Sequence, residues 1–260
     1  MLVLLPPSEG KTQPRARGPL LDLDRLSAPG LTPVREQVLD ALIQVSASPD
    51  AMRVLGVGAS LADEVARNTR LRAVPTAPAK TVYSGVLYGA AGLDRLTPTG
   101  RARAAESVRI VSGLWGLVAP DDHIPAYRLS MGTDLPGVGP LAGAWRDPLG
   151  AELAGRAEGE LVVDCRSATY LAAWHPPRSA DWVAVRVLRE LDGQRSVVSH
   201  HAKHTRGVLT RHLLTRRGRA PHDAASLARV ARELVGTELL AVELGPPARG
   251  ARTLSLVVAG

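Results

Sequence analysis

Two of the rare lysines in this sequence lie where an anion could bind or a proton could be exchanged. Lysine and arginine together number 32, yet lysine occurs only at Lys11, Lys80 and Lys203. In a chain that otherwise uses arginine as its cation, a retained lysine suggests a position that needs a compact or titratable ammonium. A lysine crowded by other cations can lose its proton and act as a base or nucleophile. Lys11 and Lys203 are therefore candidate catalytic residues, with chance as the alternative because three residues are few.

The stretch from Val111 to Gly132 has the composition of a binding-site wall. Gly113 and Gly116 allow backbone and ligand to approach closely, and the prolines that follow stiffen the turn. Large directional side chains, Trp115 among them, stand here in a chain in which aromatic residues make up only 3%. A loop of this kind favours a functional site over a simple connection. A tight turn with Trp115 in the core fits the stretch equally well.

Hydroxyl, aromatic and cationic side chains from distant segments form one candidate site for an anionic ligand. The set is Ser8, Lys11, Tyr83, Ser112, Trp115, Tyr127, Arg128, Lys203 and Arg206. Two lysines and two arginines in one cleft repel each other unless an anion neutralises them. Arginine grips phosphate with two parallel hydrogen bonds and lysine acts as a point charge, while Trp and Tyr can stack on a base or sugar. We expect a nucleotide or nucleic-acid site. The sequence contains no paired carboxylates, nucleophile elbow or complete dinucleotide fingerprint, which leaves open whether the protein is an enzyme.

The overall charge favours an anionic partner, and the rest of the composition favours the cytoplasm. The formal net charge is +7 and the isoelectric point is near 10.3, which attracts nucleic acid, phosphorylated ligands or acidic surfaces. No apolar run reaches about 18 residues, so no membrane span is expected, and the N-terminus lacks the basic region of a signal peptide. The single Cys165 excludes an internal disulfide and fits a reducing compartment. We expect a cytoplasmic monomer in which Cys165 is a small buried hydrophobe.

The histidines near residue 200 do not amount to a metal site. His200 and His204 are spaced four apart, as two ligands on one helix face can be, and His201 lies between them. No carboxylate stands near them in the sequence to orient the rings, so structural or phosphate-facing histidines are the preferred interpretation. The run Asp121-Asp122-His123 is typical of a turn cap. We expect no metal and no cofactor.

Hydrophobic patterning predicts an α+β protein, a single compact body over residues 1–260 with a mixed sheet and surrounding helices. The expected strands are 2–5, 81–89, 161–165, 238–244 and 252–258, with a hairpin formed by 182–191 and 195–199. The expected helices are 32–45, 99–107, 138–154 with an interruption at Pro148, 167–174, 200–216 and 223–234. Asp192-Gly193 is the kind of pair that closes a tight hairpin.

Residues 32–72 form a predicted helical insertion with a candidate DNA-binding turn. Thr32 is the expected N-cap of its first helix, followed by a proline at the first helical position. The Leu55-Gly56-Val57-Gly58 turn between helices is typical of a helix-hairpin-helix, which offers backbone N–H groups to a DNA phosphate. The candidate DNA-binding residues are Arg53, Gly56, Gly58, Arg67 and Arg70. Any tight corner between helices also favours glycine, and the arginines could form an ordinary solvated face.

Five separate blocks occur together in one order. They are Pro6-Pro7-Ser8-Glu9-Gly10-Lys11, Val82-Tyr83-Ser84-Gly85, Ser112-Gly113-Leu114-Trp115-Gly116-Leu117, the residues Pro125, Tyr127, Arg128, Leu129, Met131 and Gly132, and the residues Ala202, Lys203, Arg206 and Gly207. With these blocks the chain resembles the peroxide stress protein YaaA family, including its actinobacterial members. The resemblance implies a compact α/β body with a helix-hairpin-helix, a positively charged cleft, DNA binding and bending, and a cytoplasmic role in surviving hydrogen peroxide. The first block departs from the shorter enterobacterial version, although Lys11 falls at the equivalent lysine.

Three hypotheses follow. The first is a protein without enzymatic activity that holds duplex DNA by its backbone. The second is an enzyme or sensor for a small phosphorylated or nucleotide-like ligand, cradled by Lys11, Lys203 and Arg206; a deep pocket would favour it, and a long open trough would favour duplex DNA. In the third, Lys203 and Arg206 only stabilise the body, by pairing with the carboxylate of Asp134, Asp164 or Glu243.

Overall fold

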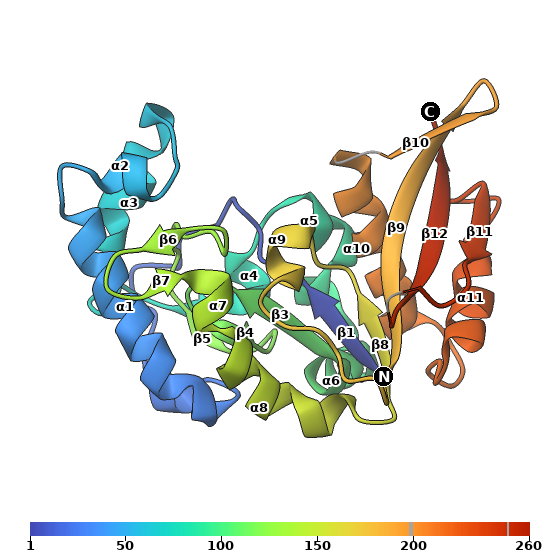
Figure 1. Ribbon diagram of the computed structural model, residues 1–260, viewed down its shortest axis with the longest axis horizontal. Coiled ribbons are helices and arrows are strands. Elements are labelled where there is room, and N and C mark those ends of the chain that lie inside the picture. The colour runs from blue at the N-terminus through green and yellow to red at the C-terminus, as the bar shows by residue number, and fades with distance from the viewer. Residues whose placement is uncertain (198–199, 249) are drawn as a thin grey trace.

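A mixed eight-stranded sheet forms the centre of the computed structural model, which describes residues 1–197, 200–248 and 250–260 (Figure 1). Its strands are β1 (Leu2–Leu5), β3 (Val108–Ser112), β4 (Gly116–Val118), β8 (Leu161–Asp164), β9 (Asp181–Leu191), β10 (Gln194–Val197), β11 (Ala241–Leu244) and β12 (Arg252–Ala259). The order is β11-β12-β9-β8-β1-β3-β4, with β10 paired to β9. The strands from β12 to β3 are parallel, and β4, β10 and β11 are antiparallel additions. Two small ribbons lie apart: β2 (Ala77–Pro78) with β5 (His123–Ile124), and β6 (Asp134–Leu135) with β7 (Gly139–Pro140).

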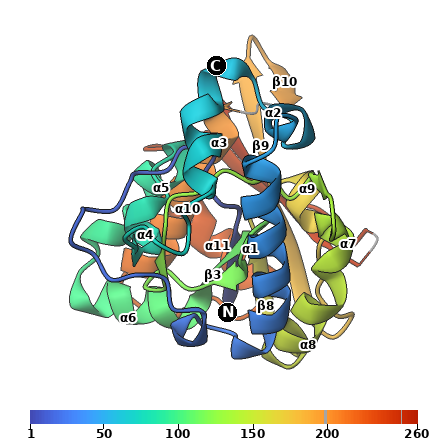
Figure 2. The ribbon, with the colours of Figure 1, turned by 90° about the vertical axis from the view of Figure 1, so that its left-hand side faces the viewer.

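Helices surround this sheet, as the sequence predicts. They are α1 (Thr32–Ser46), α2 (Ala51–Val54), α3 (Ala62–Asn68), α4 (Ala79–Val82), α5 (Val86–Ala91), α6 (Pro98–Ser107), α7 (Leu141–Ala144), α8 (Arg146–Ala157), α9 (Ala168–Leu171), α10 (His200–Thr215) and α11 (Ala224–Arg232). Single 3₁₀ turns cover Leu23–Arg25, Pro29–Leu31, Ala59–Leu61 and Leu93–Arg95. Figure 1 shows α1, α2 and α3 at one end of the molecule and α11 beside β11 at the other. Figure 2 looks onto α1 and α3, which stand in front of the sheet.

The first strand of the chain lies inside the sheet, between β3 and β8. The chain adds β3 on one side of β1 and later adds β8 on the other, so the order of strands reverses at β1. Both β1 and β8 are four-residue runs that are buried throughout, as strands covered on both faces are. In open α/β sheets, ligands bind beyond the carboxyl ends of the strands at such a reversal. The segments that follow β1 and β8 therefore form the expected edge for a site.

The predicted hairpin is confirmed up to residue 197, because residues 198 and 199 of its second strand lie outside the described residues. The last helix is confirmed as well. Asp192 and Gly193 have φ values of 51° and 74°, as a two-residue turn with both central residues left-handed requires, and Gln194 pairs with Leu191. The Asp223 carboxylate caps α11 by accepting a hydrogen bond from the Ser226 amide, and the Ser226 hydroxyl accepts one from the Asp223 amide. Local sequence signals were sufficient here because the partners are close in the chain.

Two local predictions are wrong. Residues 81–89 are not a strand: they form the end of α4 and the first part of α5. Helix α5 packs closely against α10, and this long-range contact overrides the strand-like residues of the segment. Pro148 does not interrupt a helix either, because it lies in the first turn of α8, where its missing N–H has no intrahelical partner to lose.

Residues 32–72 contain the helices α1, α2 and α3, with two differences from the sequence interpretation. Thr32 does not cap α1: the 3₁₀ turn Pro29–Leu31 runs straight into it, and the buried Thr32 hydroxyl has no hydrogen-bond partner among the described residues. Helix α2 is a single turn, and a 3₁₀ turn precedes α3. These short elements do not establish a helix-hairpin-helix, which stays a prediction. None of the described helices combines the length and apolar character needed to cross a bilayer.

Candidate functional site

A cleft of about 320 Å³ opens at the carboxyl edge of β1 and β8. Its walls are the segment after β1, the turn after α2, the loop at residues 128–130, the segment after β8, and α10. Four of its lining residues are cations: Lys11, Arg128, Lys203 and Arg206. The lining includes one acidic residue, Glu9. We call this space the four-cation cleft; it gathers five of the nine residues predicted for the anion site, namely Ser8 and the four cations.

The Lys11 amine is held by its own loop and by two tyrosine rings. Its Nζ donates to the Ser8 carbonyl oxygen at 2.8 Å and to the Glu9 carbonyl oxygen at 3.3 Å. The same atom lies 4.3 Å from the centre of the Tyr127 ring and 5.7 Å from that of Tyr83. Burial, followed by the nearby Arg128 charge, lowers the pKa of Lys11 to about 7 against the opposing carboxylates of Glu64 and Glu9. Lys11 can therefore bind or release a proton near neutral pH.

A chain of buried hydroxyls lies beneath the Lys11 amine. The hydroxyls of Tyr83 and Tyr127 are 2.9 Å apart, and Tyr127 is 2.7 Å from the Ser112 Oγ. Ser112 in turn accepts hydrogen bonds from the backbone amides of Leu114 and Trp115. Burial raises the pKa of both tyrosines above the ordinary value, so the hydroxyls stay protonated. These three side chains belong to the layer under the cleft and do not line it.

Trp115 lies in the core, as the alternative interpretation of its loop anticipated. Its side chain has no exposed surface, and its ring meets the Tyr127 ring edge-on at 5.8 Å between centres. From the stretch 111–132, the residues that line the cleft are Arg128, Leu129 and Ser130. The core packing of Trp115 fixes the Tyr127 ring on which Lys11 rests.

Helix α3 holds the Arg128 backbone in place. The Asn68 side chain donates to the Arg128 carbonyl and accepts from the Arg128 amide, both at 2.9 Å. The Arg128 guanidinium lies 3.6 Å from the Glu64 carboxylate, also on α3, and donates to the Glu9 carbonyl at 3.4 Å. The insertion thus orients one cation of the cleft.

The two α10 cations are held differently. The Arg206 guanidinium donates from Nε and Nη2 to the Val185 carbonyl on β9, at 3.3 and 2.9 Å. Lys203 is half exposed, and its Nζ is 4.0 Å from the Glu9 carboxylate. Ser8 accepts from the Ser84 amide at 3.1 Å and donates to the Gly10 carbonyl, which shapes the loop that carries Lys11.

The carboxylates Asp164 and Glu243, weighed as structural partners of Lys203 and Arg206, have other partners. Asp164 forms an ion pair with Arg166, and Glu243 forms one with Arg195. Asp134 lines a neighbouring hollow. The structural hypothesis is therefore wrong for Asp164 and Glu243, because Arg166 and Arg195 are their ion-pair partners.

Sequence reasoning missed the wall contributed by the segment after β8. Ser167, Thr169 and Tyr170 line the cleft, and burial raises the pKa of Tyr170 to about 12 despite hydrogen bonds from Met131 and Ser130. One sequence signal pointed to this segment: polar residues follow a predicted buried strand at 161–165. Because β8 is parallel to β1, the segments after both strands meet at the same edge of the sheet.

A buried ion pair holds this segment. Arg166 donates from Nε and Nη2 to the two Asp164 oxygens at 2.9 and 2.7 Å. It also donates to the carbonyls of Tyr170 and Trp174 at 3.2 and 2.9 Å. Trp182 adds an indole N–H to Asp164 at 3.2 Å. Arg166 thus fixes both ends of the turn that presents Tyr170 to the cleft.

The predicted DNA-binding residues divide between two places. A hollow of about 700 Å³ adjoins the four-cation cleft through Leu55, Gly56, Ser130 and Thr169, and Arg53 lines it. Gly56 has φ +63°, which favours glycine, whereas Gly58 does not need it at φ −79°. Arg67 and Arg70 line a separate hollow of about 590 Å³ with Gln13. Arg53 and Gly56 therefore extend the cleft, and Arg67 and Arg70 do not.

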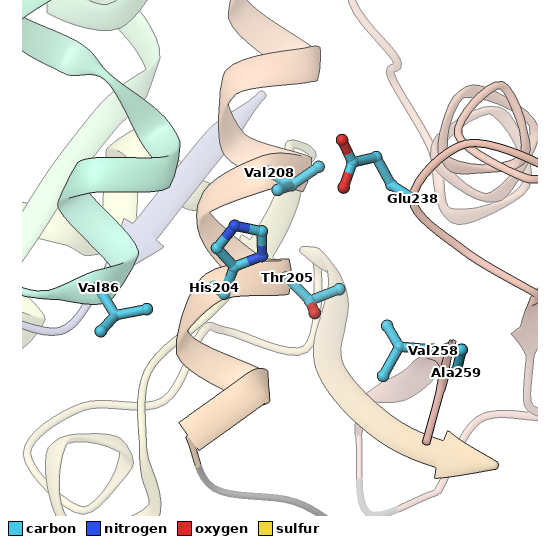
Figure 3. A pocket seen from close by; sticks show the side chains of 7 residues that line it. All are labelled: Val86, His204, Thr205, Val208, Glu238, Val258 and Ala259. Atoms are coloured by element: carbon cyan, nitrogen blue, oxygen red, sulfur yellow. The ribbon is translucent and has the colours of Figure 1, made fainter. Parts of the chain in front are cut away.

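Another hollow, of about 450 Å³, lies on the other face of α10 (Figure 3). Figure 3 shows Val86, His204, Thr205, Val208, Glu238, Val258 and Ala259 around it. Residues 204, 205 and 208 lie opposite 203 and 206 on a helix with 100° per residue. Its lining is mostly apolar and contains none of the four cations, so it does not extend the anion site.

The described residues offer no set of three His, Cys, Asp or Glu side chains placed to hold a metal. The side chains of His200 and His201 lie outside the description.

Asp122 accepts hydrogen bonds from the amides of Ala119 and Ser27, as the predicted turn cap does. Cys165 is buried, and burial raises the pKa of its thiol to about 12. A thiol held protonated in this way is a poor nucleophile toward peroxide.

Lys11→Met is expected to stabilise the protein at neutral pH. Because the pKa of Lys11 is lower in the folded chain than the unfolded value of 10.5, the unfolded chain binds the extra proton between about pH 7 and 10.5. The wild-type free energy of unfolding must therefore fall as the pH drops through that range, with the full penalty present below it. Methionine removes the penalty, on the order of a few kcal/mol.

Urea titrations of both proteins at several pH values measure this effect. The advantage of Lys11→Met should be largest at pH 7 and should shrink toward pH 10. Lys80→Met is the control, because Lys80 pairs with Asp121 outside the cleft. An advantage that does not change with pH would contradict the lowered pKa.

Known proteins match the chain over nearly its whole length. The sequence profile of the family described as peroxide stress protein YaaA matches residues 1–231. A UPF0246 protein of Streptomyces coelicolor is 46% identical, covering 99% of this chain and 98% of its own length. UPF0246 proteins of Corynebacterium efficiens and Cereibacter sphaeroides are 43% and 32% identical, covering 99% and 86% of this chain and 100% and 90% of their own lengths. The family resemblance carried by the five sequence blocks is thereby confirmed, and the chain belongs to the peroxide stress protein YaaA family.

Proposed function

We propose that this protein acts in the peroxide stress response by binding the phosphate backbone of DNA with low sequence specificity. The backbone occupies the four-cation cleft and continues over the turn at residues 55–58 into the hollow lined by Arg53. The observation that carries the proposal is the gathering of four cations from three separate chain segments around one opening.

The charges around the cleft support an anionic occupant. Among the described residues, Glu9 and Glu64 are the carboxylates within ion-pair distance of the four cations. Two carboxylates leave a surplus of positive charge, which a phosphate would neutralise. Phosphate contacts fix the position of a protein on the duplex without reading sequence, which agrees with the cations and hydroxyl side chains among the residues that line the cleft.

DNA affinity is expected to fall steeply with salt, because each neutralised phosphate releases counterions. Lys203→Ala should weaken binding to all duplexes alike and reduce the slope of log K against log salt by about one. Arg53→Ala should act in the same direction if the backbone crosses the turn. Fluorescence anisotropy with labelled duplexes of several sequences, over a range of salt concentrations, measures both quantities.

Variants of two arginines outside the cleft test which surface of the protein contacts DNA. Arg101→Ala, an exposed site on α6, should leave affinity unchanged. Arg67→Glu tests the other face of α3: a loss as large as that of Lys203→Ala would move the binding surface away from the cleft. Affinity that responds to neither salt nor Lys203→Ala would remove DNA backbone as the ligand.

A second candidate is a small phosphorylated or nucleotide-like ligand. The position of the Lys11 amine between carbonyl oxygens and the Tyr127 ring favours a small ligand. A duplex backbone can be bound by cations at the surface and does not require an amine in this position. A thermal-shift series with nucleotides and sugar phosphates tests this candidate. If a compound stabilises the protein but not the Lys203→Ala variant, and DNA binding does not depend on salt, the small-ligand function would be favoured over DNA binding.

A further inference from the structure

We propose that Lys11 is a nucleophile that forms an imine with an aldehyde carbon of a phosphate-bearing ligand held in the four-cation cleft. The inference deepens the proposed function, on whose anion-binding cleft it rests, by adding a covalent step at one residue. Arg128, Lys203 and Arg206 hold the phosphate, and the Lys11 amine lies against the Tyr127 ring.

The Lys11 amine has no carboxylate partner. Its Nζ donates to two backbone carbonyls, those of Ser8 and Glu9, which uses two of its N–H bonds. No carboxylate among the described residues lies within 4.0 Å of it, whereas Arg128 and Lys203 each have one within that range. The Tyr127 ring covers another side of the nitrogen. Lys11 also lines the cleft, so its side chain shares one opening with the other three cations.

The charged and titratable groups around Lys11 adjust its proton affinity from several elements. Arg128 disfavours the ammonium, and Glu64 on α3 and Glu9 favour it. Tyr83 and Tyr127 remain protonated because burial raises the pKa of each. Burial has the largest effect and lowers the pKa of Lys11 to about 7. A neutral amine is therefore available at physiological pH, as imine-forming lysines require.

The step balances without an oxidant, a reductant or a metal. A proton first leaves the Lys11 ammonium for solvent. The nitrogen lone pair then forms a bond to the aldehyde carbon, and the carbonyl oxygen takes up the proton that the nitrogen loses. The resulting carbinolamine loses its hydroxyl together with the remaining proton of the nitrogen as one water molecule, and the nitrogen electron pair forms the carbon–nitrogen double bond.

Two kinds of ligand contain both a phosphate and an aldehyde. An abasic position in DNA has an aldehyde in its open-chain sugar between two phosphates. A free phosphorylated aldehyde, such as 2-deoxyribose 5-phosphate, has the same groups without the strand. Both present an anion for the cations and a carbon for the amine, and the test separates them.

Borohydride trapping tests the proposal. The full-length protein is incubated at pH 7.5 with sodium borohydride and either a duplex containing one abasic site or 2-deoxyribose 5-phosphate. Reduction of the imine gives a stable secondary amine whose added mass is that of the aldehyde less one oxygen atom. Peptide mapping is expected to place the adduct on Lys11. Lys11→Arg, which replaces the amine with a guanidinium that stays protonated, should lose it, and Lys80→Arg should retain it.

Parallel anisotropy with an intact duplex separates the two proposals. An adduct on Lys11 with both probes, or with the duplex alone, supports the imine and DNA together. An adduct on Lys11 with the sugar phosphate alone, and no duplex binding, supports the imine and removes DNA. No adduct with either probe from the folded protein, or an adduct on Lys80, Lys203 or the N-terminal amine instead, overturns the proposal. Trapping on Lys11 should increase as the pH rises through 7.

Discussion

Replacing Arg166 with methionine is expected to destabilise the protein by about 3–5 kcal/mol, the range typical for leaving one member of a buried ion pair without its partner. Both side chains of the Arg166–Asp164 pair are almost completely buried. Methionine fills much of the space but leaves the Asp164 carboxylate with the Trp182 indole as its side-chain donor. The carbonyls of Tyr170 and Trp174 also lose their donor. Chemical denaturation measured at neutral pH gives the change in free energy of unfolding.

A double variant separates the buried charge from the rest of this effect. Asp164→Leu combined with Arg166→Met removes both charges and should recover part of the loss. Recovery should be incomplete, because the two carbonyls and the Trp182 N–H remain without partners. A single variant Arg166→Met within about 0.5 kcal/mol of wild type, the range of ordinary surface substitutions, would contradict this account.

Gly207→Ala is expected to destabilise the protein by about 3 kcal/mol, at the upper end of the usual cost of overpacking. A Cβ at position 207 would overlap the Leu87 carbonyl oxygen and lie 2.8 Å from the Ala90 Cβ and 3.1 Å from the Ala91 amide nitrogen. These are atoms of α5 that cannot rotate away, so α10 must move from α5. Because α10 carries Lys203 and Arg206, the same change should also weaken anion binding. Thermal and urea unfolding measure the first effect.

Gly150→Ala is the matched control for this prediction. Gly150 is also a helical glycine, in α8, but nothing lies within 4 Å of the Cβ that alanine would add. Alanine there should stabilise the protein by roughly 0.5–1 kcal/mol, because glycine loses more conformational freedom on folding. Equal effects at positions 150 and 207 would mean that helix propensity, and not the contact between α5 and α10, decides both.

Elements whose signals are local could be predicted from the sequence. The hairpin closed by Asp192 and Gly193 and the cap of α11 at Asp223 each depend on residues within a few positions of one another. The scarcity of lysine singled out Lys11 and Lys203, and the five blocks identified the family, because both are properties of the residue order. The strand prediction for residues 81–89 was wrong for the opposite reason. The helix α5 within this segment depends on packing against α10, which lies more than a hundred residues away in the chain.

Only the tertiary structure decided which candidate side chains are buried beneath the cleft and which line it. Trp115, Tyr127 and Arg128 look equally suited to a binding wall in the sequence, yet Trp115 and Tyr127 are buried beneath the cleft and Arg128 lines it. Tyr170 lines it too, although nothing in its sequence neighbourhood drew attention to it. The position of β1 between β3 and β8 determines which loops meet at one edge, and strand order results from long-range pairing that no local pattern encodes.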